Sequence, residues 1–238
     1  MKKLLLLFIL VVLVIAFIKF GRSIYVPVLN QLKEPETIQS VFDKIQGGVW
    51  DRLKTALNSA GYETNYPEKI ILVAFKEEQK LQVYANDSNK MILLKEYPFT
   101  AYSGKLGPKL QEGDRQIPEG IYEIEYLNPN SSYYLSIKVS YPNEFDKSKT
   151  KFDDFKEMGG DIFIHGKAAT IGCIPIGDQA IEEVFVLAKE AFNNKIKVII
   201  SPRDFRVNNQ YPAIEDIDWE RELYEVIEEE LKRLPLLE

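Results

Sequence analysis

The sequence predicts an α+β domain, mainly β, over about residues 67–202, with helical segments before and after it. Three observations support this fold class. Runs rich in β-branched and aromatic residues recur from Ile70 onward, separated by short polar turns. One amphipathic helical pattern follows Asp178 inside that region. Hydrophobic residues make up 45% and aromatic residues 12% of the 238 residues, which is enough to build a core and argues against intrinsic disorder.

Residues 1–22 carry the pattern of an export signal or a membrane anchor. Two lysines precede fifteen uninterrupted apolar residues, from Leu4 to Ile18, and Lys19 and Arg22 follow. That length is at the upper end for a signal-peptide core and short of the roughly 20 residues of a spanning helix. Snorkelling lysines bring it close to spanning length, and no good Ala-x-Ala cleavage site follows. We therefore expect an uncleaved anchor, with a cleaved signal as the alternative.

Helical patterns flank the β region. Residues 23–66 predict a helical stalk, with one helix from about Pro35 to Gln46, a stop at Gly47-Gly48, and a second helix that ends at Gly61. Residues 203–238 contain an acidic amphipathic helix from Asp218. Its predicted apolar face consists of Trp219, Leu223, Val226, Ile227, Leu231 and Leu234.

The expected strands begin with a three-stranded meander from Ile70, with a turn around residues 86–89. Two further strands, 120–127 and 133–141, are separated by the predicted turn Asn-Pro-Asn-Ser-Ser. A short buried strand ends at His165, and a helix follows with Asp178 as its expected N-cap. The segment 195–202 is expected to form a further strand.

Composition excludes several classes of function. The net charge is −6, but residues 215–238 hold ten acidic against three basic residues, so the rest of the chain is near neutral. No basic stripe with interleaved aromatics is present, which argues against a nucleic-acid partner. A single cysteine cannot form an internal disulfide, and one His with one Cys supplies only two of the four ligands of a zinc site. We expect no metal and no cofactor.

The only histidine, His165, and the only cysteine, Cys173, lie eight positions apart, each beside a glycine. An imidazole can take the proton of a thiol, so the two residue types suit a nucleophile and its base. Gly166 would let the chain turn out of the strand, and the amides of Gly172 and Cys173 could form an oxyanion hole. Both residue types are also common as buried side chains, so spacing alone leaves both interpretations open.

The stretch from Asp161 to Gln179 resembles the signature of the YkuD-type L,D-transpeptidases, and in particular their YafK-like branch. The matching positions are His165-Gly166, Thr170, Gly172-Cys173 and Asp178. The stretch from Ser103 to Ile124 is similar to the upstream element of the family. Its matching positions are Gly107-Pro108-Lys109, Gly113-Asp114 and Pro118-Glu119-Gly120-Ile121-Tyr122. With the segment 128–146, the resemblance covers about residues 70–202.

Two positions depart from the commoner family pattern. That pattern has a second histidine two places before the cysteine and an arginine after it, where this chain has Ile171 and Pro175. Substrate orientation must then come from other groups. The available cations are Arg115, Lys105, Lys109 and Lys167, each of which is equally consistent with a solvated surface charge.

The resemblance implies a β-sandwich catalytic domain that acts on peptidoglycan stem peptides in the bacterial envelope, on the periplasmic or extracytoplasmic side. Cys173 would attack the L,D-amide carbonyl at the third residue of a tetrapeptide stem, release the terminal D-alanine and form a thioester. His165 would transfer the proton, oriented by a backbone carbonyl, and Thr170 would help to shape the loop.

The resemblance leaves the fate of the thioester open. An acceptor amine would make the protein a transpeptidase, whereas water would make it an L,D-amidase that releases a molecule attached to peptidoglycan. A wall-binding module without turnover is an alternative from a different functional class. The acceptor, the stem-peptide chemistry and the oligomeric state do not follow from the sequence.

Overall fold

The computed structural model describes residues 34–87, 90–215 and 217–236, together with residues 7, 9–11, 14 and 17. The chain divides into two compact units, Met1–Glu36 and Thr37–Glu238. The described residues before position 34 are helical. Among the described residues, no helix combines the length and the apolar character needed to cross a membrane. The expected signal or anchor and the first part of the stalk lie mostly outside the described residues and stay predictions.

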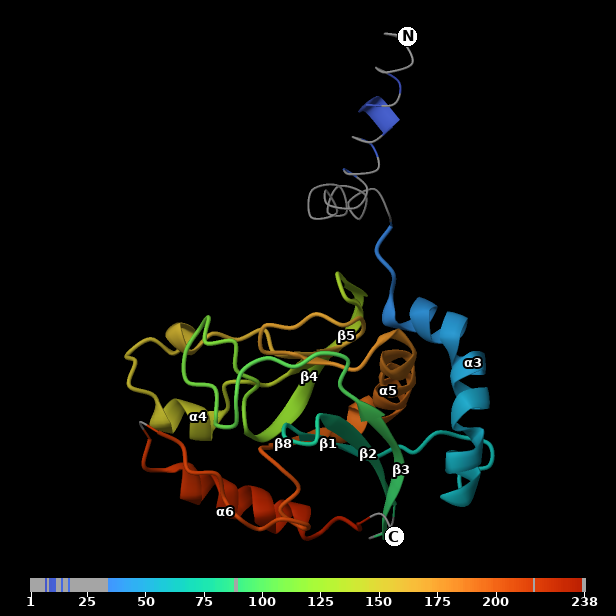
Figure 1. Ribbon diagram of the computed structural model, residues 1–238. Helices are drawn as coiled ribbons and strands as arrows, with labels where there is room; N and C mark the ends of the chain where they lie inside the picture. Colours follow the sequence, from blue (N-terminus) through green and yellow to red (C-terminus); the bar gives the residue numbers. More distant parts are fainter. Residues whose placement is uncertain are drawn as a thin grey trace. The chain divides into compact units, whose positions relative to one another are not determined.

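The second unit is an α+β domain built on one eight-stranded mixed sheet with the strand order β3-β2-β1-β8-β4-β5-β6-β7 (Figure 1). The strands are β1 (Ile70–Phe75), β2 (Lys80–Asp87), β3 (Lys90–Pro98), β4 (Gly120–Ser131), β5 (Tyr134–Val139), β6 (Phe163–His165), β7 (Ile174–Pro175) and β8 (Lys197–Ser201). The predicted α+β class is confirmed, as are the meander β1 to β3 and the short strand that ends at His165.

Strand β4 joins the two halves of the sheet. Its first residues, Gly120 to Glu123, pair with β8, and its later residues pair with β5 after a bulge that follows Ile124. Because one strand belongs to both halves, hydrogen bonds join all eight strands in one order. The expected packing of the two halves as a sandwich stays a prediction. β4 also extends through most of the predicted turn 128–132, since its pairing with β5 continues to Ser131.

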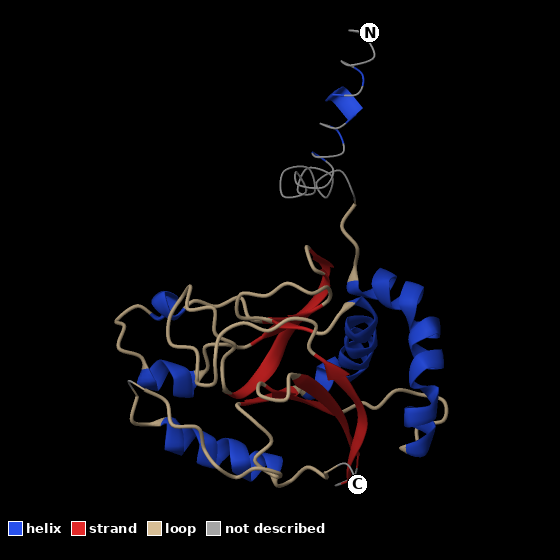
Figure 2. Ribbon diagram, viewed as in Figure 1, coloured by secondary structure: helices blue, strands red, loops and turns tan. Residues whose placement is uncertain are grey.

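Helices cover both faces of this sheet (Figure 2). The helices are α3 (Ile38–Ser59), α4 (Glu144–Lys149), α5 (Asp178–Ala191) and α6 (Glu220–Leu231), and the short 3-10 turns are η1 (Phe155–Met158) and η2 (Phe192–Asn194). α3 and α5 contribute to the core on one face, and α6 to the core on the other. Every residue of β1 is buried because its side chains alternate between these two cores.

α3 is one helix where two were expected. It continues through Gly47 and Gly48, although each glycine in a helix interior costs about 1 kcal/mol relative to alanine. Apolar side chains on both sides of the glycines belong to the same core, so burial outweighs the weak helix propensity. These buried side chains are Val41, Phe42, Val49, Leu53 and Leu57.

α6 buries a slightly different stripe from the predicted one. Leu223, Ile227 and Leu231 are buried as predicted, but Val226 is 47% exposed and Tyr224 is fully buried in its place. Tyr224 lies one helical turn before Ile227, so it extends the same stripe toward the sheet.

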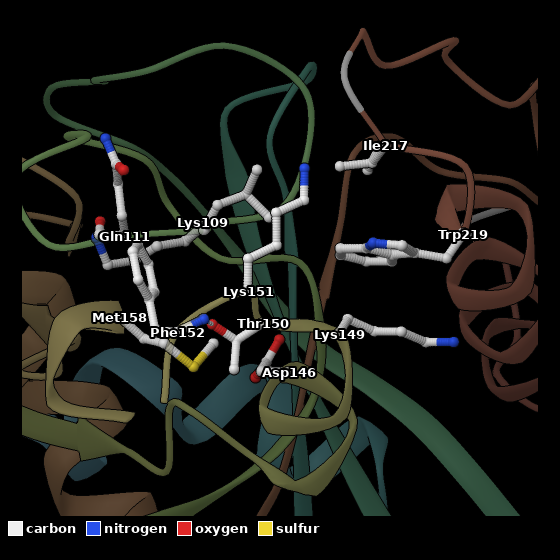
Figure 3. A pocket seen from close by; sticks show the side chains of 11 residues that line it. Lys109, Gln111, Asp146, Lys149, Thr150, Lys151, Phe152, Met158, Ile217 and Trp219 are labelled. Carbon is white, nitrogen blue, oxygen red and sulfur yellow. Dashed lines mark hydrogen bonds between the residues drawn. The ribbon is translucent and has the colours of Figure 1, made fainter. Parts of the chain in front are cut away.

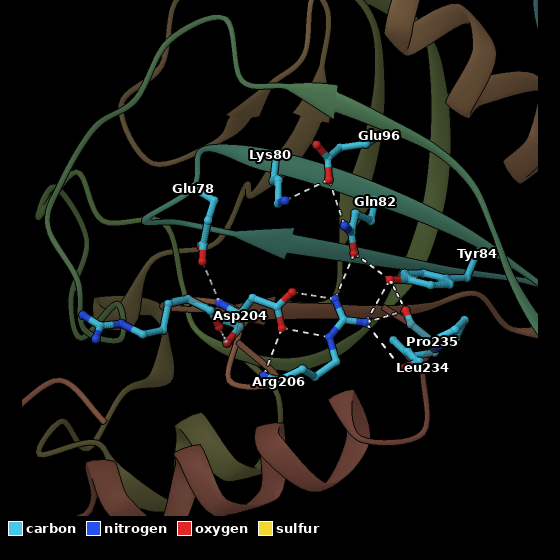
Figure 4. Close-up of polar contacts among 11 residues, drawn as sticks. Glu78, Lys80, Gln82, Tyr84, Glu96, Asp204, Arg206, Leu234 and Pro235 are labelled. Atoms are coloured by element: carbon cyan, nitrogen blue, oxygen red, sulfur yellow. Dashed lines mark hydrogen bonds and ion pairs between the residues drawn. The ribbon is translucent and has the colours of Figure 1, made fainter. Parts of the chain in front are cut away.

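A network of polar groups fastens the chain after β8 and the chain after α6 to β2 (Figure 4). The guanidinium of Arg206 donates to the carboxylate of Asp204, the hydroxyl of Tyr84, the side-chain oxygen of Gln82 and the carbonyl of Pro235. The side chains of Arg206 and Asp204 are nearly buried, so this pair is better shielded from solvent than a surface ion pair.

A buried ion pair links β1, β4 and α6. The Lys76 ammonium lies 2.9 Å from a Glu119 carboxylate oxygen, and both side chains are 0% exposed. Lys76 also donates to the carbonyls of Gly107 and Ile117, at 2.7 and 2.8 Å. Glu119 accepts from the Gly107 amide and from the Tyr224 hydroxyl of α6. Both charges are therefore fully hydrogen-bonded, the condition under which burial of an ion pair is tolerated.

We predict that Glu119→Gln lowers the free energy of unfolding by about 3–5 kcal/mol, because the Lys76 ammonium stays buried without its counter-charge. Urea denaturation followed by circular dichroism measures the loss. Glu119→Asp retains the charge and should lose less than Glu119→Gln. Arg221→Ala, which breaks an exposed pair with Glu225, is the control and should change stability by less than about 1 kcal/mol. A loss in Glu119→Gln no larger than that of the control would contradict this interpretation.

Candidate active site

His165 is the last residue of β6, and Cys173 directly precedes β7, the neighbouring strand at one end of the sheet. β6 and β7 run parallel, with Ile164 opposite Ile174 and His165 opposite Pro175. Ile164 and Ile174 are fully buried in the core that contains α5. Because side chains alternate along a strand, His165 faces away from that core, and the same alternation continued back from Ile174 puts Cys173 on that side of the sheet. The two residues that the sequence singled out thus come from neighbouring segments of the sheet, and their roles as nucleophile and base stay predictions.

The imidazole of His165 is buried and held by two neighbours. Nδ1 lies 2.6 Å from the carbonyl oxygen of Gly166, and since a carbonyl only accepts, Nδ1 carries the proton. Nε2 is then the nitrogen that can take a proton, and the expected orientation by a backbone carbonyl is confirmed. The Tyr133 ring packs against the imidazole, with centroids 4.5 Å apart. Burial lowers the pKa of His165 below its ordinary 6.5, and the hydrogen bond to Gly166 offsets part of that effect.

The thiol of Cys173 is half-buried and contacts the chain just before β6. Sγ lies 3.4 Å from the backbone oxygen of Asp161. Among the described residues, no hydrogen bond joins Sγ to the imidazole of His165. Burial raises the pKa of the Cys173 thiol, and a hydrogen bond from the Phe163 amide and the charge of Lys138 offset part of this rise. The resting thiol is therefore protonated near neutral pH and needs a base to become a nucleophile.

Thr170 closes the loop that leads to the thiol. Its Oγ1 accepts from the amides of Gly172 and Cys173, at 3.2 and 2.8 Å, and donates to the Cys173 carbonyl at 2.8 Å. The two amides expected to form an oxyanion hole are thus bonded to Thr170, and their role in such a hole stays a prediction. Gly172 has a φ of 128°, and a Cβ there would come 3.0 Å from the Gln116 carbonyl oxygen. Glycine therefore lets this loop pack on the upstream motif.

Asp178 fixes the loop that follows His165. The N-cap of α5 is Gly177 and not Asp178, whose carboxylate instead accepts from the Lys167 amide at 2.8 Å. A Cβ on Gly166 would lie 2.7 Å from both Asp178 Oδ1 and the Tyr133 carbonyl oxygen. Glycine is needed at position 166 for space and not for the sharp turn that we expected, because its φ lies outside the left-handed region.

The four candidate cations have different surroundings. Lys109 is 6% exposed and lies 2.6 Å from the carboxylate of Asp114. It therefore closes the upstream loop, residues 103–119, which is the part of the upstream element that precedes β4. Arg115 and Lys105 are exposed, and Lys167 is half-buried. Within the described part of the chain, the side chains of these three have no ion-pair partner.

Two charged groups beside the thiol were not predicted from the sequence. Lys138 on β5 lies opposite Phe163 of β6, and its Nζ is 3.0 Å from Asp161 Oδ1. Lys138 is two residues from Ser136, which pairs with His165, so strand alternation places Lys138 on the same face as the candidate site. Finding it in advance requires the register between β5 and β6, which a single sequence does not give.

A pocket lies beside the upstream loop, between that loop and the segments around α4 and before α6 (Figure 3). Its lining is Lys109, Leu110, Gln111, Asp146, Lys149, Thr150, Lys151, Phe152, Met158, Ile217 and Trp219, which includes neither His165 nor Cys173. Burial raises the pKa of Asp146 in its wall to about 6. No group of three or more His, Cys, Asp and Glu side chains within the described residues is placed to hold a metal ion.

Thr170→Val keeps the shape of the side chain but removes the hydroxyl that bonds two backbone amides. We expect the amide hydrogens of Gly172 and Cys173 to exchange with deuterium about tenfold faster, and the free energy of unfolding to fall by about 1–3 kcal/mol. Hydrogen exchange measured by NMR tests this. Thr170→Ser retains the hydroxyl and should exchange like the wild type. Equal exchange in the two variants would show that the hydroxyl does not hold the loop.

Comparison with known proteins identifies a family. The model of the YkuD family, described as an L,D-transpeptidase catalytic domain, matches residues 68–200. An Escherichia coli protein named "Putative L,D-transpeptidase YafK" is 36% identical over 118 residues, which are 49% of this chain and 46% of that protein. The chain therefore matches about half the length of the curated relatives.

Solved structures give weaker similarities. The helical cell shape determining protein Pgp2 of Campylobacter jejuni matches with 20% identity and a TM-score of 0.47 over 70% of each chain. L,D-transpeptidase 1 of Mycobacterium tuberculosis matches with 14% identity and a TM-score of 0.32, over 56% of this chain and 62% of that one. TM-scores below 0.5 do not establish a common fold, so the family rests on the sequence match. That match covers more than half of the chain and includes both His165 and Cys173. The chain belongs to the YkuD family of L,D-transpeptidase catalytic domains.

Proposed function

We propose that the protein is a cysteine L,D-transpeptidase that uses peptidoglycan stem peptides as acyl donors in cell-wall biogenesis or remodelling. The observation that supports this proposal is that a half-buried thiol directly precedes β7, while the imidazole ends β6, the strand paired with β7. The Nδ1–H of the imidazole donates a hydrogen bond to the Gly166 carbonyl, which leaves Nε2 as the base. Membership of the YkuD family supports the reaction class.

In the first half-reaction, the Cys173 thiol gives its proton to His165 as Sγ attacks the carbonyl of the L,D-amide at the third stem residue. The carbon–nitrogen bond then breaks, and the imidazolium returns the proton to the leaving amine of the terminal D-alanine. The acyl group remains on Cys173 as a thioester. In the second half-reaction an acceptor amine attacks the thioester, loses its proton through His165, and restores the thiol.

Other residues of the site have supporting roles in this proposal. The amides of Gly172 and Cys173 stabilise the oxyanion once the substrate displaces the hydroxyl of Thr170 from them. Arg115 and Lys167 are cations available for substrate carboxylates, whereas Lys109 is engaged in closing the upstream loop. The pattern in residues 1–22 supports a place in the bacterial envelope, with the domain on the extracytoplasmic side of the membrane.

An L,D-amidase that releases a molecule attached to peptidoglycan shares the first half-reaction. Ile171 favours keeping this second candidate, because it is 75% exposed at the position where the commoner pattern has a histidine. The exposed side chain at this position is thus apolar and cannot accept or donate a proton. A wall-binding module without turnover, the alternative from another class, predicts no acyl-enzyme.

Incubation of the purified full-length protein with tetrapeptide muropeptides, followed by mass spectrometry of the products, separates these candidates. We expect new cross-linked products, whereas stems that are only shortened or released would support the amidase. Cys173→Ala should lower the rate by at least about 10³-fold and His165→Ala by at least about 10²-fold. Arg221→Ala, on the exposed side of α6, is the matched control. Full activity in Cys173→Ala, or no product from the wild type, would contradict the proposed function.

The expected pH dependence follows from the lowered pKa of His165. Burial lowers the pKa of His165 below 6.5, so the imidazole stays neutral, and able to accept a proton, down to mildly acidic pH. We expect kcat/KM to hold as the pH falls to about 6.5 and to decline only below it, as the imidazole becomes protonated. Rates measured from pH 4.5 to 8 check this expectation. A decline centred above pH 6.5 is incompatible with a buried, neutral imidazole as the base.

A further inference from the structure

Asp161 contacts both a lysine, Lys138, and the candidate nucleophile, Cys173. Cys173 Sγ lies 3.4 Å from the backbone oxygen of Asp161, and Lys138 Nζ lies 3.0 Å from its carboxylate. Asp161 has a φ of 53°, in the left-handed region that non-glycine residues seldom adopt. In this conformation its carbonyl faces the thiol while its side chain meets the ammonium.

Lys138 is a buried cation with a weakly held partner. The residue is 7% exposed, and its ammonium lies over the Phe163 ring, 5.1 Å from the ring centroid. The side chain of its partner Asp161 is 92% exposed, so water screens their attraction. Among the described residues, Asp161 is the one acceptor of an ammonium that has three donors. The positive charge of Lys138 is therefore fixed in place but only partly neutralised.

We propose that Lys138 stabilises the thiolate of Cys173 electrostatically and that the Asp161 carboxylate opposes this effect. The proposal rests on the proposed function of Cys173 as the nucleophile. Lys138 acts through the thiolate and is a positioning residue, because it need not touch the substrate. Its place on β5, one strand from β6 and two from β7, holds the charge on the face of the sheet that carries the thiol.

The charged groups that act on the thiol are Lys138 from β5, Asp161 from the segment before β6 and Lys109 from the upstream loop, and His165 ends the neighbouring strand β6. Burial has the largest effect and raises the pKa of the thiol, as does the charge of Asp161, whereas the two lysines lower it. Lys109 is more tightly paired than Lys138, at 2.6 Å from a carboxylate that is 14% exposed. Lys138 is therefore the cation whose charge is most available to the thiolate.

The rate of alkylation by iodoacetamide as a function of pH tests this proposal on the full-length protein without requiring turnover. The chain has one cysteine, so the whole signal belongs to Cys173. Lys138→Met should slow alkylation at pH 7 about tenfold and move the midpoint of the pH profile upward. Asp161→Asn should speed alkylation several-fold and move the midpoint downward. Lys138→Arg retains the charge and should behave like the wild type.

Lys197→Met is the matched control, because it removes a lysine of the same sheet that pairs with Glu230, and its profile should not change. Circular dichroism verifies that each variant is folded, and Asp161→Asn still tests the proposal if Lys138→Met does not fold.

The opposite shifts of Lys138→Met and Asp161→Asn are the decisive readout, since a merely structural disturbance has no reason to follow the sign of the charge. An unchanged profile in both variants, or shifts in the same direction, would overturn the proposal. A muropeptide assay without product, beside the expected alkylation shifts, would instead overturn the proposed function alone.

Discussion

The buried pair of Lys76 and Glu119 fixes the parts of the domain on which the candidate site is built. Glu119 stands directly before β4, the strand that joins the two halves of the sheet, and Lys76 directly after β1. The same two side chains hold Gly107 in the upstream loop and Tyr224 in α6. Removing the two charges from water costs free energy, and their hydrogen bonds offset this cost only when every partner is present. These distant segments must therefore assemble together.

The upstream loop transmits this constraint to the candidate nucleophile. Lys109 and three backbone amides converge on the carboxylate of Asp114, which closes the loop. Burial alone would raise the pKa of Asp114, but these hydrogen bonds outweigh it and lower the pKa. Beyond this closed loop, the Gln116 carbonyl meets Gly172, the residue before Cys173. The upstream motif and the motif around Cys173 are thus distant in the sequence but pack directly against each other.

Burial sets the resting state of the candidate pair. It lowers the pKa of His165 and raises that of Cys173, so both side chains are uncharged near neutral pH. An ion pair at rest is therefore disfavoured, and the thiolate is expected to form as the substrate is attacked. In this resting state the Thr170 hydroxyl bonds the Cys173 amide, and the Asp178 carboxylate bonds the Lys167 amide in the loop after His165.

Local patterns in the sequence determined much of the fold and the centre of the site. The α+β class, the meander, the strand that ends at His165 and the helix from position 178 follow from periodicity and turn residues, which act over a few positions. The pair His165 and Cys173 also followed from the sequence, and the family match covers both. The signal or anchor in residues 1–22 rests on the sequence alone.

Tertiary structure decided what depends on partners far along the chain. Burial in a common core carries α3 through Gly47 and Gly48, against their helix propensity. Strand register places Lys138 beside the candidate nucleophile, and loop closure assigns the Gly172 amide to Thr170. Pairing register and burial are properties of two segments at once, whereas periodicity and turn chemistry are properties of one. For this reason the sequence determined the elements and the candidate reactive pair, and only the tertiary structure determined their surroundings.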